Sequence, residues 1–354
     1  MKPTIGEIYW LPIAAVTLVG AAIVTTLVIV VLRPLLKRYA LAMPGARSAH
    51  KVPTPQGGGI AVVTAATAAT VAISFFFVPA AGLSPQLTTL LAAVLVIASM
   101  GALDDVRPVA VAPRLLLQIL AVGAVIYALP TDLRVLPIIP GWIERSLLVV
   151  GGVWFVNLVN FMDGLDWITV AEIVPLTATI AAIGLLGLLP PQAVVVSLAL
   201  CGAMIGFGFF NRPVAKLFLG DVGSLPVGLV LGWLLVLLAG SGGRAAAVLL
   251  PLYYVADSTI TLLRRLFQAE RVWEAHRSHF YQRAVDGGFS AIEVAARVFL
   301  TNLALCGLAV ATVIVPGVFV NIAALFGGTL LVAWLLVTFA RGKRPAGGAS
   351  KSAL

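Results

Sequence analysis

Long apolar segments separated by short loops make up most of this chain of 354 residues. A run of about 20 apolar residues can cross about 30 Å of hydrocarbon as a helix. With 61% hydrophobic and only 10% charged residues, the chain has more apolar surface than a soluble domain of this length could bury. The apolar residues form blocks and do not alternate with polar ones, which excludes a transmembrane β-barrel. The sequence therefore predicts an all-α polytopic membrane protein.

We expect about eleven membrane-crossing helices in a single domain that covers residues 1–340. Residues 341–354 follow as a basic tail, which we expect to be cytoplasmic and disordered. Basic residues follow the first apolar segment instead of preceding it, so we interpret this segment as a retained helix and not as a signal peptide. The predicted spans are 10–32, 60–78, 87–103, 113–130, 146–161, 168–189, 191–210, 224–240, 245–263, 291–314 and 317–340.

Lys and Arg residues fall mainly on one side of these helices. With an external N-terminus, the cytoplasmic loops and tail hold 18 of them and the outer loops hold 4. Cytoplasmic loops are enriched in basic residues, so this bias predicts an external N-terminus and a cytoplasmic C-terminus. The basic loops also account for the formal net charge of +9, and the charge therefore does not indicate a nucleic-acid partner.

Five of the few acidic residues fall at the predicted cytoplasmic boundary of the membrane. They are Asp104, Asp105, Asp163, Asp166 and Asp221. An ionisable side chain at this depth is costly unless it has a partner or a function. Mg²⁺ binds one or two carboxylates and takes its other ligands from phosphates and water. The five aspartates therefore favour metal-assisted phosphoryl transfer at the cytoplasmic face.

Three other features each have two interpretations. Asp257 lies within a predicted span, where a structural hydrogen-bonding role competes with a functional one, and the role of Glu172 is equally open. The glycine run at 57–59 follows a basic loop that contains Lys51. This run either presents backbone N–H groups to a phosphate or forms the turn into the next helix.

Five sequence blocks carry a family resemblance when they are taken in order. The blocks are Arg47–Gly59, Gly101–Gln118, Asn157–Asp166, Phe218–Ser224 and His276–Arg283. Together they resemble the polyprenyl-phosphate N-acetylhexosaminyl-1-phosphate transferases of glycosyltransferase family 4. That family includes enzymes that start O-antigen and enterobacterial common antigen, and the phospho-N-acetylmuramoyl-pentapeptide transferase of peptidoglycan synthesis. The resemblance covers roughly residues 30–290.

The resemblance implies a role for each matching residue. It implies Asp221 and Asn157 as ligands of Mg²⁺, or of Mn²⁺ in its place. The residues that it implies as catalytic are Asp104, Asp105, Asp163 and His279. Those that it implies as substrate-binding are His50, Lys51, Gln56, Arg114, Asn160, Asp166, Phe218, His276 and Arg277.

The reaction implied by the resemblance transfers an N-acetylhexosamine-1-phosphate from a UDP-sugar to undecaprenyl phosphate. The products are an undecaprenyl-pyrophosphoryl sugar and UMP, and the step starts O-antigen or another cell-envelope polysaccharide. The expected location is the bacterial inner membrane, and a homodimer is compatible with the family. We favour direct attack by the acceptor phosphate over a covalent aspartyl intermediate, because phosphoryl transfer depends mainly on positioning and charge neutralisation.

Three positions depart from the family pattern. Tyr281 and Gln282 stand where many members have histidine, and Trp167 stands where glycine is common. These departures resemble members that transfer deoxy sugars such as N-acetylfucosamine or N-acetylquinovosamine. Trp167 either narrows the sugar pocket or packs against the following helix.

Two other functions compete with this interpretation. A transporter or flippase for lipid-linked sugars would have many helices, but its site would lie near the membrane midplane and not at one boundary. A CDP-alcohol phosphotransferase also uses several aspartates with a metal, but these cluster in one helical motif. Here the aspartates are spread over three loops.

Overall fold

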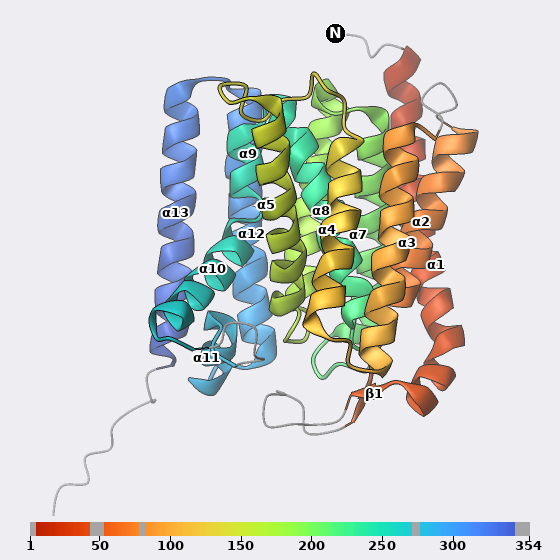
Figure 1. Ribbon diagram of the computed structural model, residues 1–354, viewed down its shortest axis with the longest axis vertical. Helices are drawn as coiled ribbons and strands as arrows, with labels where there is room; N and C mark the ends of the chain where they lie inside the picture. The colour runs from red at the N-terminus through yellow and green to blue at the C-terminus, as the bar shows by residue number, and fades with distance from the viewer. Residues whose placement is uncertain (1–4, 43–52, 78–82, 271–276, 344–354) are drawn as a thin grey trace, which may run out of the picture.

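The computed structural model describes residues 5–42, 53–77, 83–270 and 277–343. These parts form one bundle of long helices that run up and down beside one another (Figure 1). The helices are α1 (Ile5–Tyr39), α2 (Gly59–Phe76), α3 (Pro85–Val106), α4 (Val111–Tyr127), α5 (Gly141–Met162), α6 (Ile168–Ile183), η1 (a π-helix, Gly184–Leu188), α7 (Pro191–Asn211), α8 (Asp221–Gly240), α9 (Arg244–Leu249), α10 (Leu252–Phe267), α11 (Phe280–Asp286), α12 (Ala291–Ile314) and α13 (Val318–Arg341). Two short strands, β1 (Leu41–Ala42) and β2 (Thr54–Pro55), pair antiparallel, with Leu41 opposite Pro55.

Nine helices of the described chain are long and apolar enough to cross a membrane, which confirms the predicted all-α membrane architecture. The fourth predicted span corresponds to α4, a shorter apolar helix of 17 residues. The ninth predicted span, 245–263, is not one continuous helix, because it is divided into α9 and α10 at Pro251. Proline lacks the N–H that continues a helix, and its ring clashes with the preceding turn. The number of crossings and the orientation remain predictions.

One end of the bundle collects the segments that carry the predicted site. Helices α3 and α5 end there and α8 begins there, and β1 and α11 lie at the same end (Figure 1). Helix α10 is tilted relative to its neighbours and leads down to α11 (Figure 1). The five boundary aspartates therefore lie at one end of the fold, although their positions span more than one hundred residues of sequence.

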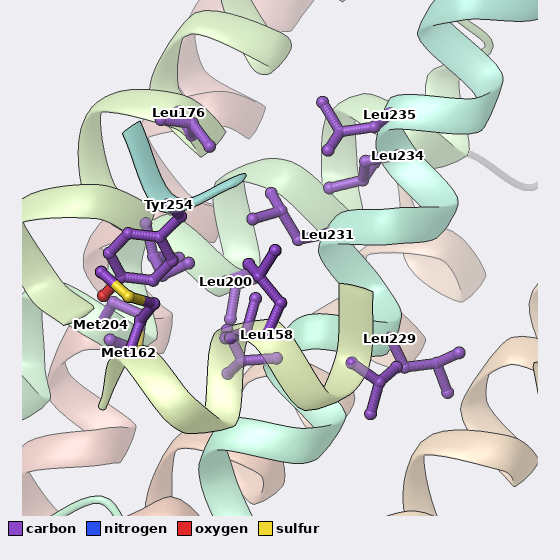
Figure 2. Close-up of a cluster of buried hydrophobic side chains, with 14 of the residues drawn as sticks. Leu158, Met162, Leu176, Leu200, Met204, Leu229, Leu231, Leu234, Leu235 and Tyr254 are labelled. Carbon is purple, nitrogen blue, oxygen red and sulfur yellow. The ribbon is translucent and has the colours of Figure 1, made fainter. Parts of the chain in front are cut away.

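Helices α7 and α8 form the buried centre of the bundle. Side chains from several helices interlock at this centre, as Figure 2 shows for Leu158 and Met162 of α5, Leu200 of α7 and Leu231 of α8, with Tyr254 of α10 beside them. Lipid is as apolar as these side chains, so close packing and internal hydrogen bonds hold the helices together, more than exclusion from water does.

Helix α1 packs against α7 through two small residues one helical turn apart. A Cβ at Gly202 would overlap the carbonyl oxygen of Leu18, and one at Gly206 would lie 2.5 Å from the carbonyl oxygen of Ala22. Glycines four residues apart allow helix backbones to approach closely, which increases van der Waals contact in a membrane.

We predict that Gly202→Ala destabilises the protein, because the added methyl group separates α1 from α7. Overpacking of this kind costs about 1–3 kcal/mol. Cys201 and Cys306 are buried free thiols, so a thiol-reactive fluorophore reports thermal unfolding in detergent. The control is Gly123→Ala on α4, where an added Cβ meets no atom within 4 Å. Equal unfolding temperatures for the two variants would contradict this account of the packing.

Candidate active site

A polar cavity of about 270 Å³ opens at the end of the bundle where α3 and α5 end. Three loops and the first turn of α8 converge on it. Its lining residues are Gln56, Asp105, Asn160, Asp163, Gly164, Leu165, Asp166, Asn211, Phe218, Leu219, Gly220, Asp221 and Gln282. Seven of these are predicted site residues: Gln56, Asp105, Asn160, Asp163, Asp166, Phe218 and Asp221.

The N-terminus of α8 is held by a carboxylate from another helix. Asp105, near the end of α3, accepts the backbone N–H of Asp221 at 2.9 Å and that of Val222 at 3.1 Å. Gly220 precedes α8 with φ of 76°, and a Cβ there would lie 2.5 Å from the Asp105 Oδ2 atom. Because the first N–H groups of a helix lack partners within the helix, this carboxylate satisfies two of them and complements the helix dipole.

One interpretation of the glycine run was that its N–H groups bind a phosphate, but those of Gly58 and Gly59 are already bonded within the protein. The N–H groups of Gly58 and Gly59 donate to the carbonyl oxygens of Phe218 and Leu219, at 2.9 and 2.8 Å. A Cβ at Gly59 would overlap the backbone of Gly223. The run is therefore the turn into α2, and it ties the start of that helix to the loop before α8.

Asp221 lies between an amide and a guanidinium. Asn160 Nδ2 donates to Asp221 Oδ1 at 2.8 Å and to the Ser224 hydroxyl at 2.8 Å. On the other side, Arg114 Nη1 lies 3.9 Å from Asp221 Oδ2 and 2.7 Å from Asp104 Oδ2. The backbone N–H of Val109 completes the environment of Asp104, with a 2.6 Å hydrogen bond to Oδ1. One cation thus serves two carboxylates from different helices.

Asp163 follows α5 and faces the same cavity. Its Oδ1 atom accepts a 2.5 Å hydrogen bond from the Thr169 hydroxyl. Burial raises the pKa of Asp163 to about 7, with a further contribution from the negative charges of Asp221, Asp105 and Asp166, and the Thr169 hydrogen bond opposes this rise. A carboxyl group with such a pKa can gain or lose a proton near neutral pH, as a general base must.

Asp166 lines the cavity, and Trp167 follows it in the chain but lies outside the cavity lining. Asp166 Oδ2 accepts the backbone N–H of Ala215 at 2.9 Å. Trp167 has φ of 64°, a left-handed conformation that glycine adopts without strain, which explains physically why glycine suits this position. Its backbone N–H donates to Asn211 Oδ1 and its indole N–H donates to the Gly208 carbonyl oxygen. The indole does not line the polar cavity and packs between α6 and α7, so it does not narrow this site.

Asn157 does not join the residues around the cavity. Its Nδ2 atom donates to Gln118 Oε1 at 2.6 Å and to the carbonyl oxygen of Val153. The amide next to Asp221 belongs instead to Asn160, one turn further along α5.

His279 is buried away from the cavity and contacts Asp257. Its Nδ1 atom lies 3.2 Å from Asp257 Oδ1, and the same carboxylate accepts the backbone N–H groups of Phe280 and Tyr281 at 3.0 and 3.2 Å. Asp257 is fully buried, and its hydrogen bonds to these two N–H groups hold the N-terminus of α11. This arrangement fits the structural interpretation of Asp257. From α11, Gln282 reaches the cavity, and the Tyr281 hydroxyl donates to the carbonyl oxygen of Phe161.

The remaining predicted residues are placed as follows. Arg277 forms a 2.8 Å ion pair with Asp286 and does not line the cavity. Gln56 donates to the carbonyl oxygen of Asp105 at 2.7 Å. His50, Lys51 and His276 lie outside the described residues.

Asn211 lines the cavity and was not predicted. It has a structural role, because it accepts from Trp167 and donates to the carbonyl oxygen of Leu217 at 3.0 Å. The signal in the sequence was weak, since a single amide at the end of an apolar span matches no motif.

The oxygen donors around the cavity suit Mg²⁺. The described residues contain no ready cage of three or more acidic, His or Cys side chains for a metal ion. Mg²⁺ does not need such a cage, because it uses one or two protein carboxylates and completes its octahedron with phosphates and water. Asp221, with the Asn160 amide beside it, provides a small number of protein ligands of this kind at the N-terminus of α8.

The family model named Glycosyl transferase family 4 matches residues 87–239, a segment that contains all five boundary aspartates. This match and the curated relatives support the assignment of the chain to this family. It is 26% identical over 292 residues to the probable undecaprenyl-phosphate N-acetylglucosaminyl 1-phosphate transferase of Bacillus subtilis (strain 168), covering 78% of this chain and 79% of the relative. The family predicted from the five sequence blocks is thus confirmed.

Two further relatives support the same placement. Decaprenyl-phosphate N-acetylglucosaminephosphotransferase of Mycobacterium leprae (strain TN) is 28% identical over 326 residues, which is 82% of this chain and 81% of that protein. Phospho-N-acetylmuramoyl-pentapeptide-transferase of Mycobacterium avium (strain 104) is 28% identical over 197 residues, covering 51% of this chain and 54% of that protein.

We predict that Asp105→Ala lowers the stability of the protein by about 1–2 kcal/mol, because two N–H groups at the start of α8 lose their acceptor. Asp105→Asn keeps one acceptor oxygen and should lose less. Thermal unfolding in detergent, followed with the thiol-reactive dye, measures both. Asp132→Ala, at an exposed loop position, is the control. If Asp105→Ala unfolds at the same temperature as the control, the proposed capping role is wrong.

Proposed function

We propose that this protein transfers an N-acetylhexosamine-1-phosphate from a UDP-sugar to a polyprenyl phosphate, releasing UMP and leaving a pyrophosphate-linked sugar on the lipid. The observation that carries the proposal is that Arg114 joins Asp104 to Asp221, which lines the polar cavity. Carboxylates next to a cation and a helix N-terminus suit phosphate groups and a divalent ion. The reactions named for the relatives are of this kind.

In this proposal, Asp221 and the Asn160 amide hold Mg²⁺, or Mn²⁺ in its place. The metal, when bound, neutralises charge on the transferring phosphoryl group. Arg114 adds positive charge beside Asp104 and Asp221 and would orient a phosphate there. Asp166 and Phe218 also line the cavity, where they would contact the uridine. Asn157 donates to Gln118 of α4 and is therefore not assigned to the metal. Its role in the proposal is to hold the part of α5 that carries Asn160.

The two adjacent aspartates have different roles in the proposal. Both oxygens of Asp105 accept N–H groups of α8, so Asp105 positions Asp221 instead of reacting. Asp163 has one oxygen held by Thr169, and its raised pKa suits a group that takes the proton of an incoming acceptor phosphate. The phosphate then attacks directly, without a covalent bond to the protein.

N-acetylglucosamine is the first sugar to test, because the Bacillus and Mycobacterium relatives are named for it. N-acetylfucosamine and N-acetylquinovosamine come next, since Tyr281 and Gln282 replace family histidines and Gln282 lines the cavity. The acceptor in the proposal is undecaprenyl phosphate in a bacterial inner membrane, with the cavity facing the cytoplasm. The product would start O-antigen or another cell-envelope polysaccharide.

A direct test offers the purified protein a panel of UDP-sugars with undecaprenyl phosphate and Mg²⁺ in detergent. The proposal expects UMP release with at least one UDP-N-acetylhexosamine, dependent on both lipid and metal. UMP release that does not require the lipid, or none with any sugar, would contradict it. A transporter would release no UMP under these conditions.

We expect Asp221→Asn to lower kcat by about 100-fold or more, because an oxygen ligand and a negative charge are lost where the metal would sit. The UMP assay measures the change, and thermal unfolding checks that the fold is retained. Asp132→Asn makes the same chemical change at an exposed loop position and should leave kcat unchanged. Near-normal turnover of Asp221→Asn at saturating Mg²⁺ would refute the metal assignment.

A further inference from the structure

An apolar groove of about 560 Å³ lies between α6, α7 and α12, separate from the polar cavity. Small residues make this space: Ala171 on α6, Gly208 on α7, and Ala295 and Ala296 on α12. Phe209 at its edge is 68% exposed, as expected for a side chain that faces lipid. The groove is therefore open to the membrane.

One charged side chain lines this groove. Arg212 comes directly after α7 ends, so it lies at the same end of the bundle as the aspartates. In the described part of the chain, no acidic side chain forms an ion pair with it. By contrast, Arg114, Arg265 and Arg277 each have a carboxylate within 2.8 Å. The guanidinium of Arg212 is thus available to an anion that enters from the membrane surface.

A wall divides the groove from the polar cavity. Trp167 lines the groove, and its indole N–H donates to the Gly208 carbonyl oxygen at 2.7 Å. Its backbone N–H donates to Asn211, which lines the cavity on the other side. The groove and the cavity share no lining residue. A phosphate at Arg212 would consequently lie outside the site that contains Asp104 and Asp221.

We infer that this groove binds an anionic membrane phospholipid, with one acyl chain along α6, α7 and α12 and the headgroup phosphate at Arg212. The apolar lining suits an acyl chain, and a guanidinium pairs with a phosphate through two N–H groups. A basic side chain near the membrane surface favours anionic over neutral lipids. The polyprenyl phosphate acceptor is not the occupant, because its phosphate must reach the aspartates on the other side of the wall.

Trp167 provides a local probe for this lipid. The full-length protein is placed in nanodiscs with brominated phosphatidylglycerol or brominated phosphatidylcholine carrying identical chains, because bromine quenches a nearby indole. The difference from Trp167→Phe isolates the fluorescence of this one tryptophan. We expect phosphatidylglycerol to quench it at about fivefold lower mole fraction than phosphatidylcholine, the preference that one basic side chain supplies.

Two variants with matched controls test the two parts of the site. Arg212→Gln should abolish the preference for phosphatidylglycerol, whereas Arg341→Gln, at the end of α13, should keep it. Ala296→Phe should fill the groove and reduce quenching by both lipids, whereas Ala323→Phe, at an exposed position on α13, should not. If Trp167→Phe does not fold, native mass spectrometry can measure how much phosphatidylglycerol each arginine variant retains. Arg212→Gln should then retain less of this lipid than Arg341→Gln.

Several results would overturn the inference. Equal quenching by the two lipids in the unmodified protein would show that Arg212 selects no headgroup. Recovery of Trp167 fluorescence when one equivalent of undecaprenyl phosphate is added would assign the groove to the substrate. If neither lipid quenches Trp167 and Ala296→Phe changes the oligomeric mass, a second copy of the chain covers the groove.

Discussion

The hydrogen bonds from the N-terminus of α8 to the Asp105 carboxylate fix the geometry on which the rest of the candidate site depends. They hold the first residue of α8, Asp221, against the end of α3. This contact is close because Gly220 has no side chain to separate the two segments. The glycine turn at 57–59 binds the same loop from the other side. Three segments distant in sequence thus meet around one helix terminus, and the cavity is the space that they leave.

That junction brings charges together that would repel one another without a cation. Asp105, Asp163 and Asp221 line the cavity, and Arg114 is the cation that bridges Asp221 to the neighbouring Asp104. A surplus of carboxylates at a helix N-terminus favours a divalent ion and the phosphates that it carries. The bundle contributes rigidity, because its helices are held by close backbone contacts such as those of Gly202 and Gly206 with α1.

Nine of the eleven predicted spans correspond to helices long and apolar enough to cross a membrane, because apolar length decides them. The fourth corresponds to the shorter helix α4, and the ninth is divided into α9 and α10 at Pro251. The sequence also predicted most cavity residues, since its motifs occur where helices end at the membrane boundary. Side-chain partners were harder to predict. Asn157 and Asn160 are three residues apart on α5, and only the packing of α4 and α8 decides that one contacts Gln118 and the other Asp221. His279 is directed to Asp257 by the capping of α11, which no local pattern reveals.

The central claim is that the protein breaks the bond between the two phosphates of a UDP-sugar and not the bond to the sugar. A donor labelled in its β-phosphate distinguishes these reactions in one extraction. Charge-neutralising groups around a transferring phosphoryl group predict attack at the β-phosphorus. The account predicts that the label moves into the organic phase with the lipid while unlabelled UMP stays in water. Label that remains in water as UDP would contradict it.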